Sequence, residues 1–491
     1  MARFQMNPKI SVSVVFVAAM FMSIMDITIV NVALPAIGRQ FHESTTALDS
    51  VAVGYLVSLA VFIPAAGWLG DRFGMKRILL MAVAIFTGAS VLCGLAGSLS
   101  ELVLFRVLQG VGGGLMTPVG MAMLFRTFPP EERVRASSIL VVPTAVAPAM
   151  GPVLGGLLVT DLSWRWVFFV NLPFGIVAIV FGILFLAEHR QPDPGSFDLR
   201  GFLLSGIGFA LVMFGVSEGP DRGWGSPGIL ASIVVGAVLL TALVQVERRT
   251  AKPILQLRLF GNRLFRSASL VLMIGMASFL GVLFVAPLFF QIALGLSALQ
   301  SGLNTFPEAL GVMVGAQLAT RIFYPRVGPR RLVSAALVGV AASMALMSFV
   351  GFDTNLWWMR VLMFTMGLSM SQVFISSQAA AFATVSHAET GQASSLFNSG
   401  RQLGSALGVA LLATVLAAVG TTHVVAGHTE PNLSAYHAAF LTAAVISLVA
   451  SGVALTIKDA DAAATMVRRV THKVNRDAVP IEPNPSPQGA G

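Results

Sequence analysis

The sequence predicts an all-α polytopic membrane protein. Of its 491 residues, 56% are hydrophobic and 11% are charged. An average soluble domain has about 25% charged residues, more than twice this share. Long apolar runs recur along the chain, each close to the roughly 20 residues that an α-helix needs to cross a bilayer. A transmembrane β-barrel would instead show short segments of alternating polarity, so the continuous runs favour helices.

Fourteen such runs are predicted to span the membrane. They cover residues 11–34, 50–69, 77–96, 102–122, 136–158, 166–187, 199–217, 228–245, 267–290, 303–323, 331–350, 356–378, 400–418 and 438–457. The first run is too long for the apolar core of a signal peptide, and Pro35 follows it where a small residue would be needed for cleavage. We therefore interpret it as an uncleaved first span.

The distribution of basic residues predicts the orientation of the chain. Most of the 31 Lys and Arg residues fall in the N-terminus, the C-terminal tail and the even-numbered loops, whereas the odd-numbered loops hold only Arg39, Arg165 and Arg222. Short cytoplasmic loops carry such an excess, so both termini are expected in the cytoplasm. The net charge of +9 therefore indicates topology and contact with anionic lipid rather than nucleic-acid binding.

Two loops reveal an internal repeat. "DRFGMKRIL" (71–79) aligns with "PRVGPRRLV" (325–333) at an offset of 254, and the same offset places Arg106 on Arg360. The expected units are therefore a six-helix bundle at 1–198, two inserted helices at 199–246, a second six-helix bundle at 247–457 and a Pro-rich, disordered tail at 458–491. Repeated six-helix units with a substrate site between them are a transporter architecture.

Four charged residues lie well inside the predicted spans: Asp26, Arg106, Glu308 and Arg360. Each is costly there, so chance placement is not expected. With a rise of about 1.5 Å per residue, Asp26 and Arg106 fall at similar depth in the outer part of the membrane, as do Glu308 and Arg360. Two interpretations stay open, namely static ion pairs that hold each bundle together, or a carboxylate that takes up a proton as its exposure changes.

The remaining chemistry of the sequence excludes several classes of protein. The single cysteine, Cys93, permits no intramolecular disulfide, and no histidine lies within a predicted span. No glycine-rich phosphate loop ending in Gly-Lys and no cluster with metal-ligand spacing occurs, which argues against an ATP-driven pump, a metal centre or an enzyme. We expect no cofactor and a proton gradient as the energy source.

Several motifs resemble those of the major facilitator superfamily. "GWLGDRFGMKRILL" (67–80) is similar to its loop between helices 2 and 3, "RVLQGVGGGLMTP" (106–118) to its helix 4 motif and "APAMGPVLGG" (147–156) to the helix 5 motif of its antiporters. "MDITIVNVALP" (25–35) and "WRWVFFVNLP" (164–173) resemble motifs of the fourteen-span drug:proton antiporters. The resemblance implies a major facilitator fold with 14 transmembrane helices arranged as 6+2+6.

The resemblance also implies roles for particular residues. Proton coupling is expected at Asp26, Arg106 and Glu308, with Arg360 as a possible ion-pair partner of Glu308. A conformational latch between the halves is expected in the loop that holds Gly67, Asp71, Arg72, Gly74, Lys76 and Arg77. A seam between the halves is expected at the antiporter helix motif, Gly151, Pro152, Gly155 and Gly156, with ordinary helix packing as the alternative.

These observations together predict a proton-coupled antiporter of the bacterial cytoplasmic membrane that exports drug-like, often cationic or lipophilic compounds. Export of a specific metabolite, such as an amino acid, sugar, siderophore or antibiotic, is the alternative. A non-transporting sensor or a membrane enzyme is the alternative from another class, although no output domain or catalytic motif supports it. The loop at 420–437 is short, whereas relatives that work with a periplasmic adaptor tend to have a longer one, so the resemblance implies no obligatory adaptor. We expect a monomer whose partners are small molecules, protons and lipid.

Overall fold

The computed structural model describes residues 6–43, 45–139, 141–191, 195–250, 252–425 and 428–466, and these are almost entirely helical. The first part of the chain forms α1 (Pro8–Phe41), α2 (Thr45–Phe73), α3 (Met75–Leu95), α4 (Leu99–Thr127), α5 (Arg133–Ile139), α6 (Val141–Asp161), α7 (Trp166–Phe169) and α8 (Asn171–Phe185). Two helices follow, α9 (Leu199–Arg222) and α10 (Pro227–Glu247).

The second part of the chain has a similar series of elements. It forms α11 (Arg263–Leu288), α12 (Ala298–Leu318), α13 (Tyr324–Val327), α14 (Pro329–Met347), α15 (Leu356–Ala383), α16 (Thr390–Val419), α17 (Leu433–Ala454) and α18 (Ala463–Met466). Turns of π-helix at Phe289–Ala293 and Ala319–Phe323 extend α11 and α12. Single 3-10 turns lie at Pro130–Glu132, Leu257–Gly261 and Asp459–Ala462.

The helices have the length and composition of membrane spans. Within the described residues, twelve helices are long and apolar enough to cross a bilayer. Helices α6 and α12 are not among those twelve, but each has 21 residues and they pack against each other within the bundle. The predicted all-helical membrane fold is therefore confirmed.

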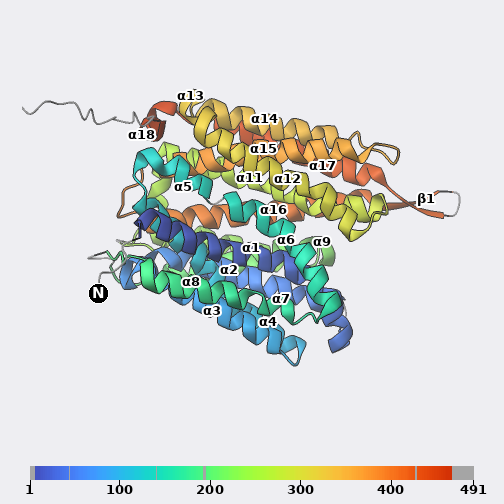
Figure 1. Ribbon diagram of the computed structural model, residues 1–491, viewed down its shortest axis with the longest axis horizontal. Coiled ribbons are helices and arrows are strands. Elements are labelled where there is room, and N and C mark those ends of the chain that lie inside the picture. Colours follow the sequence, from blue (N-terminus) through green and yellow to red (C-terminus); the bar gives the residue numbers. More distant parts are fainter. Residues whose placement is uncertain are drawn as a thin grey trace, which may run out of the picture.

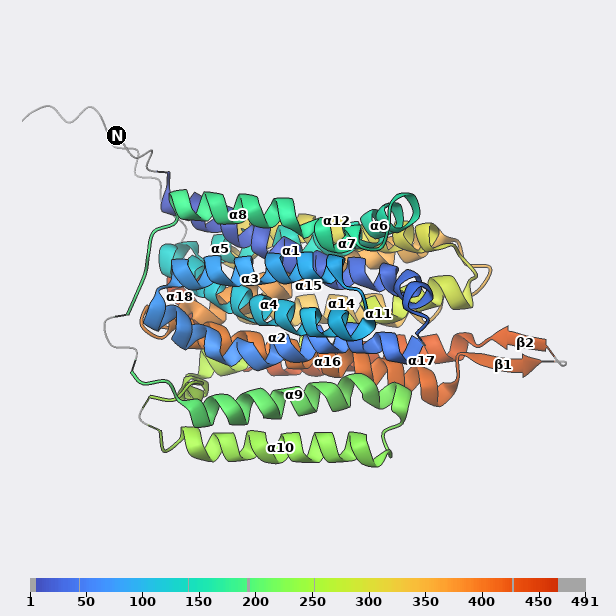
Figure 2. The same cartoon turned by 90° about the horizontal axis from the view of Figure 1, so that it is seen from below.

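The helices form two groups with a pair of helices at one edge. Figure 1 shows most of α1–α8 in the lower part of the molecule and α11–α15 with α17 in the upper part, with α6 and α16 between them. Helices α9 and α10 lie side by side along one edge, next to α2 and α16 (Figure 2). The indole of Trp224 donates to Thr414 Oγ1 of α16 at 2.7 Å, which ties the end of α9 to the second group.

Several boundaries differ from the predicted spans. Helix α16 begins at Thr390, ten residues before the predicted run at 400–418, because its first third is rich in Ser, Asn, Gln and Gly and escapes a count of apolar residues. The predicted fifth span at 136–158 is divided between α5 and α6.

The loop at 420–437 contains an antiparallel hairpin of β1 (Thr422–Val425) and β2 (His428–Pro431), which the sequence did not predict. Of the predicted disordered tail, residues 467–491 lie outside the described residues.

The two loops that align in sequence also adopt matching geometry. Gly74 and Gly328 precede α3 and α14 with φ of +102° and +80°, a conformation that glycine adopts without strain. Two residues later, the backbone N–H of Lys76 donates to Glu188 Oε1 at 3.0 Å, and that of Arg330 donates to Asp459 Oδ1 at 2.8 Å. In both places a carboxylate therefore satisfies a free N–H at the start of a helix.

Candidate functional site

The carboxylate of Asp26 is completely buried in the middle of α1. Its Oδ2 accepts a hydrogen bond from Arg106 Nη1 on α4, in an ion pair. Its Oδ1 accepts from Gln109 Nε2 at 2.8 Å and from Asn171 Nδ2 at 3.0 Å. Three donors from α4 and α8 thus converge on one acidic side chain of α1, which compensates for the cost of burying its charge.

The guanidinium of Arg106 is held as firmly as its partner. Nη1 also donates to Gln109 Oε1 at 2.8 Å, and Nε donates to the carbonyl oxygen of Val51 at 3.2 Å. The guanidinium lies over the ring of Tyr55, 4.3 Å from its centroid, which adds a cation–π contribution. The hydroxyl of Tyr55 shares a hydrogen bond of 3.1 Å with Ser23. Asp26 and Arg106, which the sequence placed at similar depth in the membrane, therefore form an ion pair in the structure.

This arrangement connects the protonation of Asp26 to the packing of three helices. A proton on the carboxylate takes the place of a donor and weakens the ion pair, so at least one of the contacts from Arg106, Gln109 or Asn171 must lengthen. Sequence reasoning missed Gln109 and Asn171 because neutral residues do not stand out as charged ones do. Both are polar side chains within long apolar runs, which is the feature that marks them.

Glu308 and Arg360 do not form the expected ion pair. Arg360 Nε donates to Asn304 Oδ1 at 2.8 Å, and its guanidinium lies 4.7 Å from the ring centroid of Trp357. Glu308 is 8% exposed and has no hydrogen bond or ion pair to any described residue. The two residues do not pair because they lie at different depths. Helix α12 begins at Ala298, so Glu308 lies ten residues, or about 15 Å, into the helix. Asn304, one turn nearer to the helix start, takes the arginine instead.

The latch loop makes its main ionic contact with a residue outside the motif. Asp71 Oδ1 pairs with Arg126 Nη2 of α4 at 2.8 Å, and both side chains are almost fully buried. Arg126 Nε also donates to the carbonyl oxygen of His387, in the loop between α15 and α16, at 2.9 Å. Arg126 therefore joins the latch loop to the second half of the chain. Arg72, by contrast, is exposed and contacts no described residue through a hydrogen bond or ion pair.

The other basic residues of the loop act within the first half. Lys76 Nζ donates to the carbonyl oxygens of Ile183 and Leu186, each at 2.8 Å. Arg77 Nε lies 3.7 Å from Glu188 Oε2 in an exposed pair, a kind that contributes little. These contacts attach α3 to the end of α8. Of the three residues expected to form ionic contacts between the halves, Arg72 and Arg77 make none with the second half, whereas Asp71 pairs with Arg126, which reaches it.

The two halves touch through backbone and aromatic rings at the same end of the bundle. The N–H of Gly67 donates to Ser395 Oγ at 2.9 Å, and a Cβ on Gly67 would lie 2.6 Å from the carbonyl oxygen of Gly391. Nearby, Phe125 of α4 stacks on Phe382 of α15 with ring centroids 4.5 Å apart. We call this region, defined by Gly67, Phe125, Arg126, Phe382 and Gly391, the closed end.

Gly67→Ala should push the halves apart at the closed end, because the new methyl group meets backbone atoms of α16 that have no room to move. The separation is measured between spin labels on cysteines placed at Arg72 and Ala388, in a Cys93→Ser background. A longer distance than in the parent protein is expected. Gly228→Ala serves as the control, since a Cβ there meets nothing within 4 Å. An unchanged distance in Gly67→Ala would contradict this account of the closed end.

The helix 5 motif packs inside the first half instead of forming a seam. A Cβ on Gly151 would lie 2.0 Å from Thr28 Oγ1, and one on Gly155 would lie 3.1 Å from Ile29 Cγ1, both on α1. A Cβ on Gly156 would meet nothing within 4 Å, and the side chain of Pro152 lies outside the described residues. Where α6 faces α12, larger side chains line a cavity of about 330 Å³. Val146, Met150, Val153 and Leu154 come from α6, and Phe306, Ala309, Leu310 and Met313 come from α12. The alternative of ordinary helix packing thus describes Gly151 and Gly155 in this structure.

A bundle of membrane-length helices in two groups, with a buried charge network and contacts between the groups at one end, is the architecture of a membrane transporter. Residues 16–409 match the family model of the Major Facilitator Superfamily, and the chain belongs to this family. It is therefore a multi-pass membrane transporter and not an enzyme.

The chain is also similar to two relatives named as multidrug resistance proteins and to one solved transporter structure. The chain is 32% identical over 407 residues to the multidrug resistance protein B homolog of Mycobacterium tuberculosis, covering 82% of this chain and 75% of that protein. It is 32% identical to the putative multidrug resistance protein MdtD of Pectobacterium carotovorum, covering 84% and 88%. The crystal structure of the human organic anion transporter MFSD10 (TETRAN) has the same fold, with a TM-score of 0.65 at 16% identity over 91% of this chain and all of that one.

Proposed function

We propose that this protein is a proton-coupled antiporter that exports drug-like compounds, often cationic or lipophilic, across the bacterial cytoplasmic membrane. The observation that carries the proposal is the buried carboxylate of Asp26, held by an arginine and two amides. The names of the relatives, which describe multidrug resistance proteins, support the class of substrate. No cofactor takes part, and the protein acts as a monomer without an obligatory adaptor.

Fourteen spans in a 6+2+6 arrangement fit this proposal. Helices α6 and α12 each have 21 residues and a length of about 31 Å, enough for a bilayer core. With these two, the first group (1–198) and the second group (247–457) have six spans each, and the pair α9–α10 (199–246) stands between them in sequence. The excess of basic residues in alternate loops then puts the closed end and both termini on the cytoplasmic side.

In this mechanism, proton uptake changes which side of the membrane the central space faces. A proton that enters from outside neutralises Asp26 and releases Arg106 from its ion pair, which changes the packing of α1 against α4. The closed end opens when the contacts of Gly67, Asp71 and Arg126 with the second half separate. Asp26 then releases its proton to the cytoplasm as the substrate enters from that side, and the charged form carries the substrate back to the outward-facing state.

Purified protein in liposomes tests the proposal. We expect that ethidium moves against its gradient when the pH across the membrane differs, and that its addition releases protons into a compartment monitored with a pH-sensitive dye. Dissipating the pH difference with an uncoupler should stop the uphill movement. Ethidium transport that continues unchanged without a proton gradient would contradict proton coupling. Proton movement driven only by a single metabolite would favour a specific exporter instead.

Glu308→Gln should selectively weaken the export of cationic compounds. Glu308 is buried without a partner among the described residues, so a cation that enters the low-dielectric interior is attracted to it. Transport of a monocationic dye at low concentration should fall about tenfold, the equivalent of about 1.4 kcal/mol, while a neutral substrate is little affected. Exposed Glu430→Gln in the hairpin is the control. An equal loss for both compounds would point to proton coupling or structure in place of cation recognition.

A further inference from the structure

Arg401 is a cation inside the bundle that has no countercharge. It lies eleven residues into α16, about 16 Å from the start of that helix. No described residue forms an ion pair or hydrogen bond with its side chain, and its Nε is buried without a partner. Two other arginines within the membrane-length helices differ, since Arg106 pairs with Asp26 and Arg360 binds Asn304. Arg401 is half-buried, and a buried, charged N–H donor without a partner at this depth indicates a ligand.

Helical geometry directs Arg401 toward the space between the two halves. Gly404 and Gly408 of α16 face α11, because a Cβ on either would collide with the carbonyl oxygen of Met273 or Ala277. Asn398 faces the first half, where its Nδ2 lies 3.4 Å from the sulfur of Met121. At 100° per residue, Arg401 falls between these two faces.

A layer of aromatic rings lies about one helical turn from Arg401, on the side of the closed end. Phe382 of α15 stacks on Phe125 of α4 and contacts Phe397 of α16 with centroids 5.5 Å apart. Gln378 is one helical turn from Phe382, and Arg401 is one turn from Phe397. Because α15 and α16 run in opposite directions, both steps lead away from the closed end. The amide and the guanidinium therefore stand at the same level above the rings.

Unpartnered polar groups surround this level. Gln378 is completely buried, and neither its Oε1 nor its Nε2 has a hydrogen-bond partner among the described residues. The hydroxyl of Ser377, next to Gln378 on α15, is also buried and unpartnered in the described structure. Buried polar groups are almost always hydrogen-bonded in native proteins, so these groups on α15, together with the unpartnered Nε of Arg401 on α16, indicate a polar ligand.

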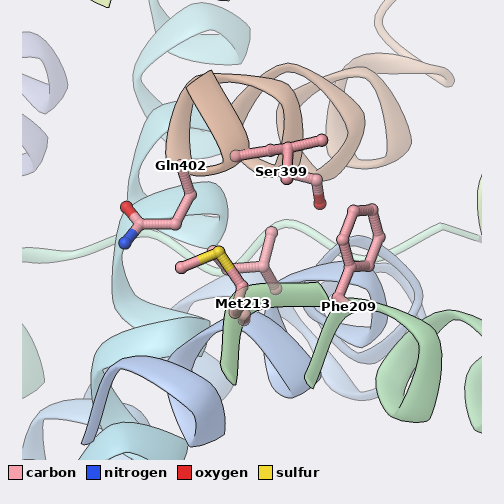
Figure 3. A pocket seen from close by; sticks show the side chains of 7 residues that line it. Phe209, Met213, Ser399 and Gln402 are labelled. Carbon is pink, nitrogen blue, oxygen red and sulfur yellow. The ribbon is translucent and has the colours of Figure 1, made fainter. Parts of the chain in front are cut away.

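The opposite face of α16 does not offer such a site. Figure 3 shows Ser399 and Gln402 on the side toward Phe209 and Met213 of α9. The cavity between them has a volume of about 10 Å³, which holds at most one water molecule. This cavity therefore has no room for a transported molecule, whereas the Arg401 face of α16 has unpartnered polar groups beside it.

We propose that Arg401, with Gln378, binds a carboxylate group of the transported molecule. A guanidinium presents two parallel N–H donors that match the two oxygens of a carboxylate, and the unpartnered Nε2 of Gln378 adds a further N–H donor. Aromatic rings below the site suit the apolar body of such a molecule. The inference rests on the proposed function and adds to its substrates lipophilic compounds that carry a carboxylate, either anionic or zwitterionic.

Two dyes that differ only at a carboxylate test this site. Rhodamine 110 carries a free carboxyl group, and rhodamine 123 is its methyl ester. Binding of each dye to the purified full-length protein in detergent is measured by fluorescence anisotropy. We expect Arg401→Gln to weaken binding of rhodamine 110 about 10- to 100-fold, as for the loss of a hydrogen-bonded charged partner. Binding of rhodamine 123 should change little, and Arg401→Lys should recover part of the affinity because it keeps the charge.

The outcomes separate this proposal from the proposed function. An equal loss for both dyes, or no loss for either, would overturn the carboxylate site, as would wild-type protein that binds rhodamine 123 but not rhodamine 110. Wild-type protein that binds neither dye would overturn it as well. If the protein binds rhodamine 110 selectively but shows no proton-driven transport, the carboxylate site is supported and the antiport proposal is refuted. Unchanged binding of the ester also shows that the Arg401→Gln protein is folded.

Discussion

Asp26→Asn should reduce proton-driven export to the rate of liposomes without protein. The amide has nearly the size of the carboxylate but takes up no proton at neutral pH, so it removes the coupling step and keeps the packing. It also leaves Arg106 without its countercharge, and breaking a buried ion pair costs about 3–5 kcal/mol of stability. The measurement is uphill transport of ethidium in proteoliposomes under an imposed pH difference, with thermal unfolding recorded on the same preparations.

A second variant separates coupling from folding. Asp26→Asn combined with Arg106→Gln removes both charges, so no isolated charge remains buried and stability should recover in part. Transport should not recover, because no group is left to carry the proton. Asp161→Asn, at the exposed end of α6, is the matched control and should transport normally. Export against a gradient at the wild-type rate in either Asp26 variant would disprove the coupling role.

The pairing of Asp26 with Arg106 could be predicted because isolated charges in apolar helices are rare and the rise of a helix fixes their depth. Similar depth made the ion pair feasible, the family resemblance supported it, and the structure contains it. The contribution of Asn171 could not be predicted in the same way. Its position depends on the packing of α8 against α1 and α3, where it also donates to Ser90 Oγ at 3.0 Å, and no local pattern encodes that packing.

Errors in the predicted helix boundaries account for two other differences. The predicted run at 400–418 placed Arg401 at a membrane surface, where an arginine is ordinary. The true start of α16 at Thr390 places it deep in the bundle. Helix α12 likewise starts at Ala298, five residues before the predicted span. Glu308 therefore lies deeper in the bundle than expected, and Arg360 binds Asn304 instead. A count of apolar residues finds the hydrophobic centre of a span, but it misses helical turns that are polar because they face other helices and not lipid.

The latch shows a further limit of sequence reasoning. The motif indicated that Asp71 makes an ionic contact, and it favoured the basic residues beside it in sequence, Arg72 and Arg77. The structure pairs it with Arg126, 55 residues away at the end of α4. Tertiary packing brings α2 and α4 together, so the partner is set by the fold of the first half.

Asp71→Asn and Arg126→Ala should lower the turnover rate more than they weaken substrate binding. Both remove the buried pair, and Arg126→Ala also removes the hydrogen bond to the carbonyl oxygen of His387 across the closed end. The contacts touch the other half and not the substrate, so their loss changes the balance of conformations. A shift of about 1–2 kcal/mol changes that balance roughly 5- to 30-fold.

The turnover rate and the apparent affinity for ethidium are measured separately in proteoliposomes. Arg72→Ala is the control that this structure provides, because Arg72 is next to Asp71 in the motif yet exposed and without a hydrogen bond or ion pair to any described residue. Its turnover should stay close to that of the wild type. If Arg72→Ala slows transport as much as Arg126→Ala does, the latch acts through the charge of the whole loop and not through the pair. If Arg126→Ala lowers affinity at unchanged turnover, Arg126 belongs to the substrate site, because a contact that only holds the closed end together cannot act on binding alone.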